Sequence, residues 1–180
     1  VRELYDSLGI YRKECEKYEA DDIIATYAKK EKGTVVIVSP DKDMCQLVSD
    51  KVCIYDVKKD KYTWIEDVKE KHGVYPTDFV FYQSILGDKI DNIPGISGIG
   101  PKKAAEIVSQ RKTNSLKEAY VKILKENDTQ IKKNEKLVKL KDDLDVENHS
   151  VKFEPSGIKT FGDFLDKMEI KSEALKKYSR

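Results

Sequence analysis

The chain has 180 residues, of which 39% are hydrophobic, 9% aromatic and 37% charged, and its formal net charge is +1. A chain of this length fits one domain with a small addition and buries roughly 70% of its unfolded surface, which suffices for a core. The longest apolar run, residues 35–38, is far shorter than a membrane span, and no signal peptide opens the chain. We therefore expect a soluble intracellular protein, and Val1 in place of Met suggests a fragment.

The three cysteines, at positions 15, 45 and 53, are odd in number and too widely spaced for a CxxC pair. We expect them to be reduced and to behave as small hydrophobic residues. The two histidines, His72 and His149, leave little room for a histidine-rich metal site or a serine triad. Any chemistry in this chain must then rest mostly on carboxylates.

The first part of the chain alternates between helical and extended patterns. In chain order we expect a helix over 19–30, a strand over 34–39, a short helix through Met44, Leu47 and Val48, and strands over 52–56 and 62–65. The unbroken apolar strand is typical of a parallel sheet covered on both faces. This order of elements predicts an α/β layer.

After about residue 66 the pattern becomes helical. Thr77 can cap a helix that Gly87 ends, and a loop rich in Gly and Pro, residues 91–100, leads to Pro101 at the start of another helix. Three further helical stretches are expected over 115–126, 129–144 and 160–168.

The charges are segregated along the chain. Residues 1–99 hold 15 Lys and Arg against 19 Asp and Glu, residues 100–141 hold 12 against 5, and residues 142–180 hold 7 against 9. A basic segment beside an acidic one suits a metal-assisted enzyme that acts on a polyanion. Solvated, lysine-rich helical faces are the alternative explanation.

Carboxylates cluster at three element boundaries: the start of a helix, the end of a buried strand and the end of a second helix. The clusters are Glu19, Asp21 and Asp22; Asp41 and Asp43; and Asp88 and Asp91. Gathered in one crevice, these side chains would repel each other unless hard cations such as Mg²⁺ or Mn²⁺ neutralised them. Taken singly, each cluster is better explained by helix capping and the macrodipole, but the occurrence of all three together with the motif that follows favours the metal site.

A glycine hairpin precedes the helix that begins at Pro101. Gly98 and Gly100 allow a ligand to approach the backbone closely, and the N–H groups ahead of the helix form an anion site. Such a site reads the phosphate backbone rather than base sequence. A plain turn between two helices is the alternative. The expected DNA-binding residues are Gly95, Ser97, Gly98, Ile99, Gly100, Lys102 and Lys103.

Three segments and the hairpin resemble the 5′→3′ exonuclease domain of bacterial DNA polymerase I, within the flap endonuclease superfamily. The segments are residues 19–22, 39–47 and 87–95. The resemblance implies a PIN-like (resolvase-like) α/β fold with a parallel sheet layer, as the C-terminal part of a nuclease core over residues 1–75. It further implies a helical helix–hairpin–helix subdomain over residues 76–180, whose hairpin, at about 88–110, grips duplex DNA.

The resemblance also implies a structure-specific 5′→3′ exonuclease and 5′-flap endonuclease of replication and repair, which hydrolyses DNA or RNA-primer phosphodiesters with two Mg²⁺ or Mn²⁺ ions. Metal ligands carried over from the family are Glu19, Asp21, Asp22, Asp41, Asp43, Asp88 and Asp91. Asp22, Asp41, Asp43 and Asp91 are the expected catalytic residues. The carbonyls of residues 95–98 would supply a K⁺ site.

The family also has an Asp-bearing N-terminal strand and a basic helical arch, and neither has a counterpart here. A non-catalytic DNA-binding fragment is therefore an alternative function, and a PIN-like ribonuclease is a weaker one that the hairpin disfavours. The expected partners are duplex DNA with a 5′ flap, nick or primer and a covalently linked polymerase domain. We expect a monomer in the cytoplasm, associated with the nucleoid and with no membrane.

Overall fold

The computed structural model describes residues 10–146, and the helix expected over 160–168 lies outside them. Residues 18–144 belong to one compact unit of the chain. No helix within the described range combines the length and the apolar character that crossing a bilayer requires.

The α/β part begins with helix α2, Ala20–Lys30, as the sequence predicts. Asp21 and Asp22 lie in its first turn and Lys29 and Lys30 in its last, so the charges at both ends oppose the helix dipole. The elements that follow are strand β1 (Val35–Val38), 3₁₀-helix η1 (Lys42–Leu47) and strands β2 (Val52–Asp56) and β3 (Lys61–Thr63).

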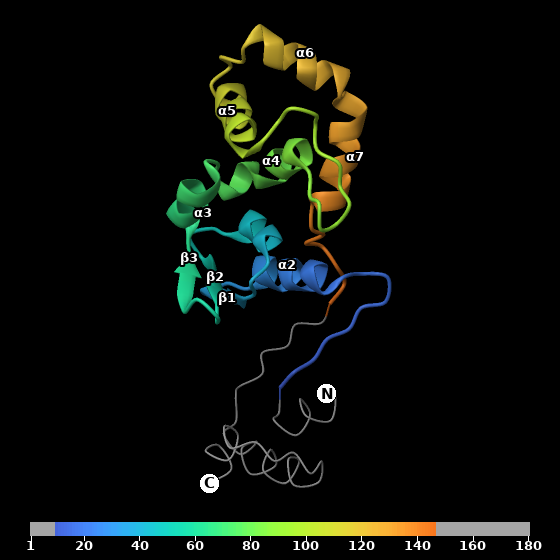
Figure 1. The fold of residues 1–180 in the computed structure, drawn as a ribbon. Coiled ribbons are helices and arrows are strands. Elements are labelled where there is room, and N and C mark those ends of the chain that lie inside the picture. Colours follow the sequence, from blue (N-terminus) through green and yellow to red (C-terminus); the bar gives the residue numbers. More distant parts are fainter. Residues whose placement is uncertain (1–9, 147–180) are drawn as a thin grey trace. The chain divides into compact units, whose positions relative to one another are not determined.

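The three strands form one small sheet in the order β1-β2-β3 (Figure 1). β1 and β2 are parallel, with Val35 opposite Val52, whereas β2 and β3 are antiparallel, with Tyr55 opposite Tyr62. The parallel pairing expected of the apolar strand is present, and the polar turn after β2 makes the third strand antiparallel.

The expectation that both faces of β1 are covered is wrong for the described residues. Ile37 is 5% exposed and faces the core, but Val36 is 46% and Val38 62% exposed. Only one side of β1 therefore packs against other described elements. The expected helix through Met44, Leu47 and Val48 is the 3₁₀-helix η1 and stops at Leu47.

After β3, all regular elements of the described chain are helices (Figure 1). They are α3 (Ile65–His72), η2 (Pro76–Asp78), α4 (Phe79–Leu86), α5 (Pro101–Lys112), α6 (Glu118–Glu126) and α7 (Asp128–Val138). Helix α3 was not predicted, and α7 ends six residues earlier than the pattern suggested (138 against 144). Pro101 opens α5 and Gly87 ends α4 as predicted.

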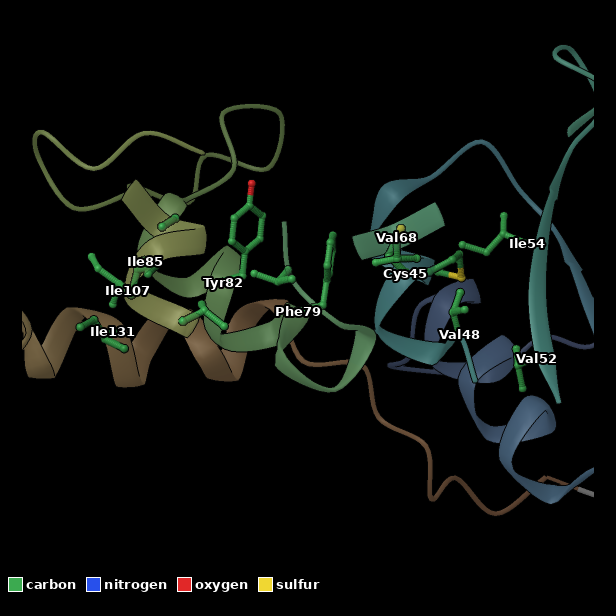
Figure 2. Close-up of a cluster of buried hydrophobic side chains, with 14 of the residues drawn as sticks. Cys45, Val48, Val52, Ile54, Val68, Phe79, Tyr82, Ile85, Ile107 and Ile131 are labelled. Atoms are coloured by element: carbon green, nitrogen blue, oxygen red, sulfur yellow. The ribbon is translucent and has the colours of Figure 1, made fainter. Parts of the chain in front are cut away.

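One hydrophobic core runs through both parts. Figure 2 shows Ile85, Ile107 and Ile131 from α4, α5 and α7 lying together, while Cys45 and Val68 lie with the sheet side. Phe79, at the start of α4, is fully buried in the same core. This shared core fixes α4 relative to η1, and these two elements lead into the acidic segments of the candidate site.

Candidate metal centre and nucleic-acid interface

The first acidic side chains of the site follow β1, where the chain leaves the carboxyl end of a parallel strand. Asp41 caps η1, and its Oδ1 accepts the backbone N–H of Asp43 at 2.8 Å. The Ser39 hydroxyl accepts the backbone N–H of Asp41 at 3.1 Å, which fixes the turn between strand and helix. Because α/β proteins bind ligands in the crevice at this end of their strands, the turn brings two carboxylates to a ligand-binding position.

The second acidic segment lies between α4 and α5. Asp88 and Ile93 exchange two backbone hydrogen bonds, of 2.8 and 2.7 Å, and Asn92 has a φ of 55°, so the chain reverses within a few residues. We call residues 88–93 the acidic loop. Asp88 is 5% exposed, whereas Asp91 is exposed.

The two segments meet. Asp43, Asp88 and Asp91 each offer one carboxylate oxygen, and the three oxygens lie within 4.8 Å of one another. We call these side chains the three-acid group. Like charges this close repel, and a set of donors made only of carboxylate oxygens suits hard divalent ions. The group is therefore a candidate site for a divalent metal ion.

Two polar side chains of the chain itself contact the three-acid group, and sequence reasoning missed both as site residues. Lys42 forms an ion pair with Asp88, whose side chain is only 4% exposed. Nε2 of Gln83, on α4, donates to Oδ1 of Asp43 at 2.5 Å. Gln83 is 1% exposed in an otherwise largely apolar helix. Such a residue signals a buried polar contact, but the sequence does not name its partner.

These contacts set the pKa values of the acids. Burial raises the pKa of Asp43 above its ordinary value. The hydrogen bond from Gln83 acts to lower this pKa, and the charge of Asp41 acts to raise it. Burial also acts to raise the pKa of Asp88, but the hydrogen bond from Lys42 and nearby backbone N–H groups hold it below the ordinary value. Neighbouring carboxyls with pKa values pushed in opposite directions are typical of functional sites.

The acids of α2 take two different roles in the structure. Burial, and then the charges of the two acids that follow β1, raise the pKa of Asp21, so this carboxyl lies in the same acidic environment. Asp22 instead holds backbone groups. Its Oδ1 accepts the N–H of Lys141 at 2.8 Å and its Oδ2 the N–H of Glu19 at 3.4 Å.

Of the seven predicted metal ligands, three therefore form a compact group and two lie in their electrostatic neighbourhood. Asp22 is engaged with two backbone N–H groups, and Glu19 precedes α2 with an exposed side chain. The three groupings are Asp43, Asp88 and Asp91; Asp21 and Asp41; and Glu19 and Asp22.

Two buried isoleucines anchor the glycine hairpin, and the residues between and after them are exposed. Ile96 and Ile99 are 5% and 8% exposed, and the Ile96 N–H donates to the carbonyl of Ile85 at 2.9 Å. Gly98 has a φ of 75°, and Lys103 Nζ donates to its carbonyl at 3.0 Å. The exposed residues here are Ser97, Gly98, Gly100, Lys102 and Lys103. The predicted DNA-binding residues are thus mostly exposed, and Ile99 is an anchor.

The family comparisons divide the chain in two. Residues 1–73 match the N-terminal resolvase-like domain of 5′-3′ exonucleases, and residues 74–160 match the C-terminal SAM fold of the same family. These matches confirm the predicted fold class, a resolvase-like domain followed by a helical one.

Curated relatives include a 5′-3′ exonuclease of Aquifex aeolicus, 36% identical over 185 residues, which cover 96% of this chain and 63% of the relative. DNA polymerase I of Rhizobium leguminosarum is 49% identical over 113 residues, or 61% of this chain and 11% of that protein. DNA polymerase I of Bacillus subtilis is 41% identical over 117 residues, or 61% of this chain and 13% of that protein. The chain thus spans less than two thirds of each of these relatives.

Solved structures with the same fold include a mutant of the T5 5′-exonuclease, with a TM-score of 0.62 and 25% identity over 92% of this chain and 68% of that one. A T5 5′-exonuclease with bound zinc has a TM-score of 0.63, with 25% identity over 92% of this chain and 62% of that one. A T5 flap endonuclease in a pseudo-enzyme-product complex with DNA and metal ions has a TM-score of 0.62, with 24% identity over 92% of this chain and 61% of that one.

Proposed function

Because this chain belongs to the 5′-3′ exonuclease family, we propose that it hydrolyses phosphodiester bonds as a structure-specific 5′→3′ exonuclease and 5′-flap endonuclease in replication and repair. The observation that carries the proposal is the three-acid group, in which Asp43 meets Asp88 and Asp91 across the fold. Its substrates are DNA or RNA primers, and its partner is duplex DNA with a 5′ flap, nick or primer.

Two divalent ions, Mg²⁺ or Mn²⁺, are proposed as the cofactors. The three-acid group would hold one side of the site, and Asp21 and Asp41 the other, with Glu19 and Asp22 supporting the start of α2. When bound, such ions activate water and stabilise the leaving oxygen. Within the chain, Gln83 orients the Asp43 carboxylate and Lys42 neutralises part of the negative charge at Asp88.

The glycine hairpin is proposed to grip duplex DNA through its backbone. Exposed N–H groups and two lysines ahead of and within the first turn of α5 suit phosphates, and residues 100–141 hold 12 basic against 5 acidic residues. A K⁺ held by the carbonyls of residues 95–98 belongs to the same proposal. The Gly98 carbonyl accepts a hydrogen bond from the ammonium of Lys103, so Lys103 would have to move for K⁺ to bind that oxygen.

For the whole protein, we propose an α/β nuclease core over residues 1–75 and a helical DNA-binding subdomain over 76–180. The family matches that meet between residues 73 and 74 support this division. The remaining proposals are a covalently linked polymerase domain, supported by the polymerase I relatives, a monomeric state, and a location in the cytoplasm at the nucleoid.

Cleavage of a 5′-flap duplex in Mg²⁺ tests the catalytic proposal. Asp43→Asn should lower the rate by about 100-fold or more, because a metal ligand contributes several kcal/mol to the transition state. Asp142→Asn is the matched control, because Asp142 forms an exposed ion pair with Lys29. A rate that Asp43→Asn leaves unchanged would contradict the metal assignment.

DNA binding is tested separately by the double variant Lys102→Ala and Lys103→Ala. Affinity for a branched duplex should fall to a similar degree for all sequences, and the dependence of affinity on salt should become shallower. A loss confined to some sequences would argue against a grip on the backbone.

A second candidate function is metal and DNA binding without turnover. The three-acid group and the exposed residues of the glycine hairpin are compatible with it, because neither feature requires that hydrolysis follows binding. Salt-sensitive binding of the flap duplex with no product in Mg²⁺ or Mn²⁺ would identify this function. Turnover of RNA in preference to flap DNA would instead indicate a PIN-like ribonuclease.

A further inference from the structure

Helix α7 holds both ends of the acidic loop through one buried side chain. Asn134 is 1% exposed, and its Nδ2 donates to the carbonyl of Ser84 at 2.8 Å and to the carbonyl of Pro94 at 2.7 Å. Ser84 lies in α4, just before the loop, and Pro94 comes immediately after it. A single amide group therefore ties the chain entering the acidic loop to the chain leaving it.

A second amide on α7 repeats part of this contact one turn earlier. Nε2 of Gln130 donates to the carbonyl of Pro94 at 2.9 Å and to that of Gly95 at 3.3 Å. Positions 130 and 134 share a helix face because they are four residues apart. In Figure 1 the segment between α4 and α5 runs beside α7, as these bonds require.

The loop is also closed at its base by two glycines. A Cβ atom added to Gly87 would lie 2.2 Å from the backbone N of Gly95, and one added to Gly95 would lie 2.0 Å from the carbonyl oxygen of Leu86. The backbone on the two sides of the acidic loop, at residues 86–87 and at Gly95, is therefore in direct contact. Because of this contact, a shift of one side that α7 holds would move the other side and the acids between them.

The Oδ1 atom of Asn134 is buried, and within residues 10–146 it has no hydrogen-bond partner. An unpaired buried amide oxygen is unfavourable for stability. The two hydrogen bonds of the Nδ2 group offset this cost, and the carbonyls that accept them lie on either side of the acidic loop.

We propose that Asn134, assisted by Gln130, is a positioning residue that sets the distance of Asp88 and Asp91 from Asp43. It does not touch the metal or the substrate and acts only through the backbone of the acidic loop. This inference rests on the proposed nuclease function and adds a part of the site that lies on a different helix, outside the acidic segments.

The test uses the full chain with three substitutions: Asn134→Leu, which keeps the volume but removes the amide, Gln130→Ala, and Lys136→Ala as an exposed control on the same helix. Mn²⁺ affinity is measured by electron paramagnetic resonance well below the melting temperature. The Mg²⁺ concentration for half-maximal flap cleavage and the affinity for flap DNA in Ca²⁺ are measured in parallel.

We expect Asn134→Leu to weaken Mn²⁺ binding by about tenfold and to raise the half-maximal Mg²⁺ concentration by a similar factor, the lower end of what loss of an outer-shell partner causes. Gln130→Ala should cause a smaller shift in the same direction, and both should bind DNA as the parent does. A role in folding alone would lower the melting temperature but leave the Mn²⁺ affinity of the folded protein unchanged.

Mn²⁺ affinities of both variants within twofold of the parent would overturn the inference while leaving the nuclease function intact. A parent chain that binds no Mn²⁺ and cleaves no flap would instead overturn the proposed function and the inference together. If Asn134→Leu does not fold, Gln130→Ala decides the question alone, and an unchanged Mn²⁺ affinity refutes the inference.

Discussion

Replacing Lys42 with methionine tests whether the three-acid group behaves as one electrostatic unit. The carboxylate oxygens of Asp43, Asp88 and Asp91 lie within 4.8 Å of one another. At that separation two unit charges repel by about 3.5 kcal/mol at an effective dielectric constant of about 20, and by about 0.9 kcal/mol in water. The ammonium of Lys42 offsets part of this repulsion through its ion pair with Asp88.

Removal of one partner of a buried ion pair costs about 3–5 kcal/mol, but the Lys42 side chain is 37% exposed, so we reduce the figure to about 1–3 kcal/mol. For a chain of this length, this corresponds to a fall in melting temperature of roughly 2–12 °C in a solution containing EDTA. The matched control is Lys29→Met, whose ion pair with Asp142 is exposed on both sides and should contribute at most about 1 kcal/mol.

Divalent ions should reverse the loss. A divalent ion that binds the folded protein at 100 times its dissociation constant adds about 2.7 kcal/mol of stability. In the Lys42→Met variant the ion meets no competing ammonium, so Mg²⁺ should raise the melting temperature more than it does in the parent. Thermal unfolding with EDTA and with Mg²⁺ measures both values. An equal rise in the two proteins, or no loss in EDTA, would refute the reasoning.

Three further predictions concern pH and the glycines. Because burial raises the pKa of Asp43 and metal ions bind the deprotonated carboxylate, Mn²⁺ affinity measured by paramagnetic resonance should fall as the pH drops through that raised value. Burial lowers the pKa of His72 to about 4, so between about pH 6.5 and 4 the folded state binds fewer protons than the unfolded one and stability is lost as the pH falls. His72→Phe should remove about 1–2 kcal/mol of this pH-dependent loss in the free energy of unfolding, after discounting for the partial exposure of His72. Urea unfolding at both pH values measures the loss, and an unchanged pH dependence in the variant would contradict the prediction. Gly95→Ala should destabilise the fold by about 1–3 kcal/mol in the same assay because its Cβ would meet backbone, whereas Gly100→Ala, with open space around it, should have little effect.

The sequence predicted those parts of the fold that depend on neighbours along the chain. Helix α2, the β-branched strand and the start of α5 at Pro101 each follow from a local pattern and form as expected. The membership in the 5′-3′ exonuclease family was equally predictable, because the acidic motifs and the glycine hairpin are long and ordered.

The contacts that hold the site together could not be predicted in the same way. Lys42 and Asp88 are 46 positions apart, and Asn134 and Ser84 are 50 apart. A local pattern does not state which distant group a buried amide or ammonium will reach. The exposure of Val36 had a similar cause, because a uniformly apolar strand does not indicate which of its faces other elements will cover.

The composition of β1 has a consequence for handling the protein. Its four residues are all valine or isoleucine. If β1 paired with a neighbouring strand one position out of register, each aliphatic side chain would be replaced by another, so its sequence specifies the register only weakly. Among the described strands β1 also lies at the border of the sheet, and a border strand can pair with another molecule. Dilute protein should remain monomeric, and Val38→Lys, on the solvent side of the strand, should reduce any pairing through β1 in concentrated preparations.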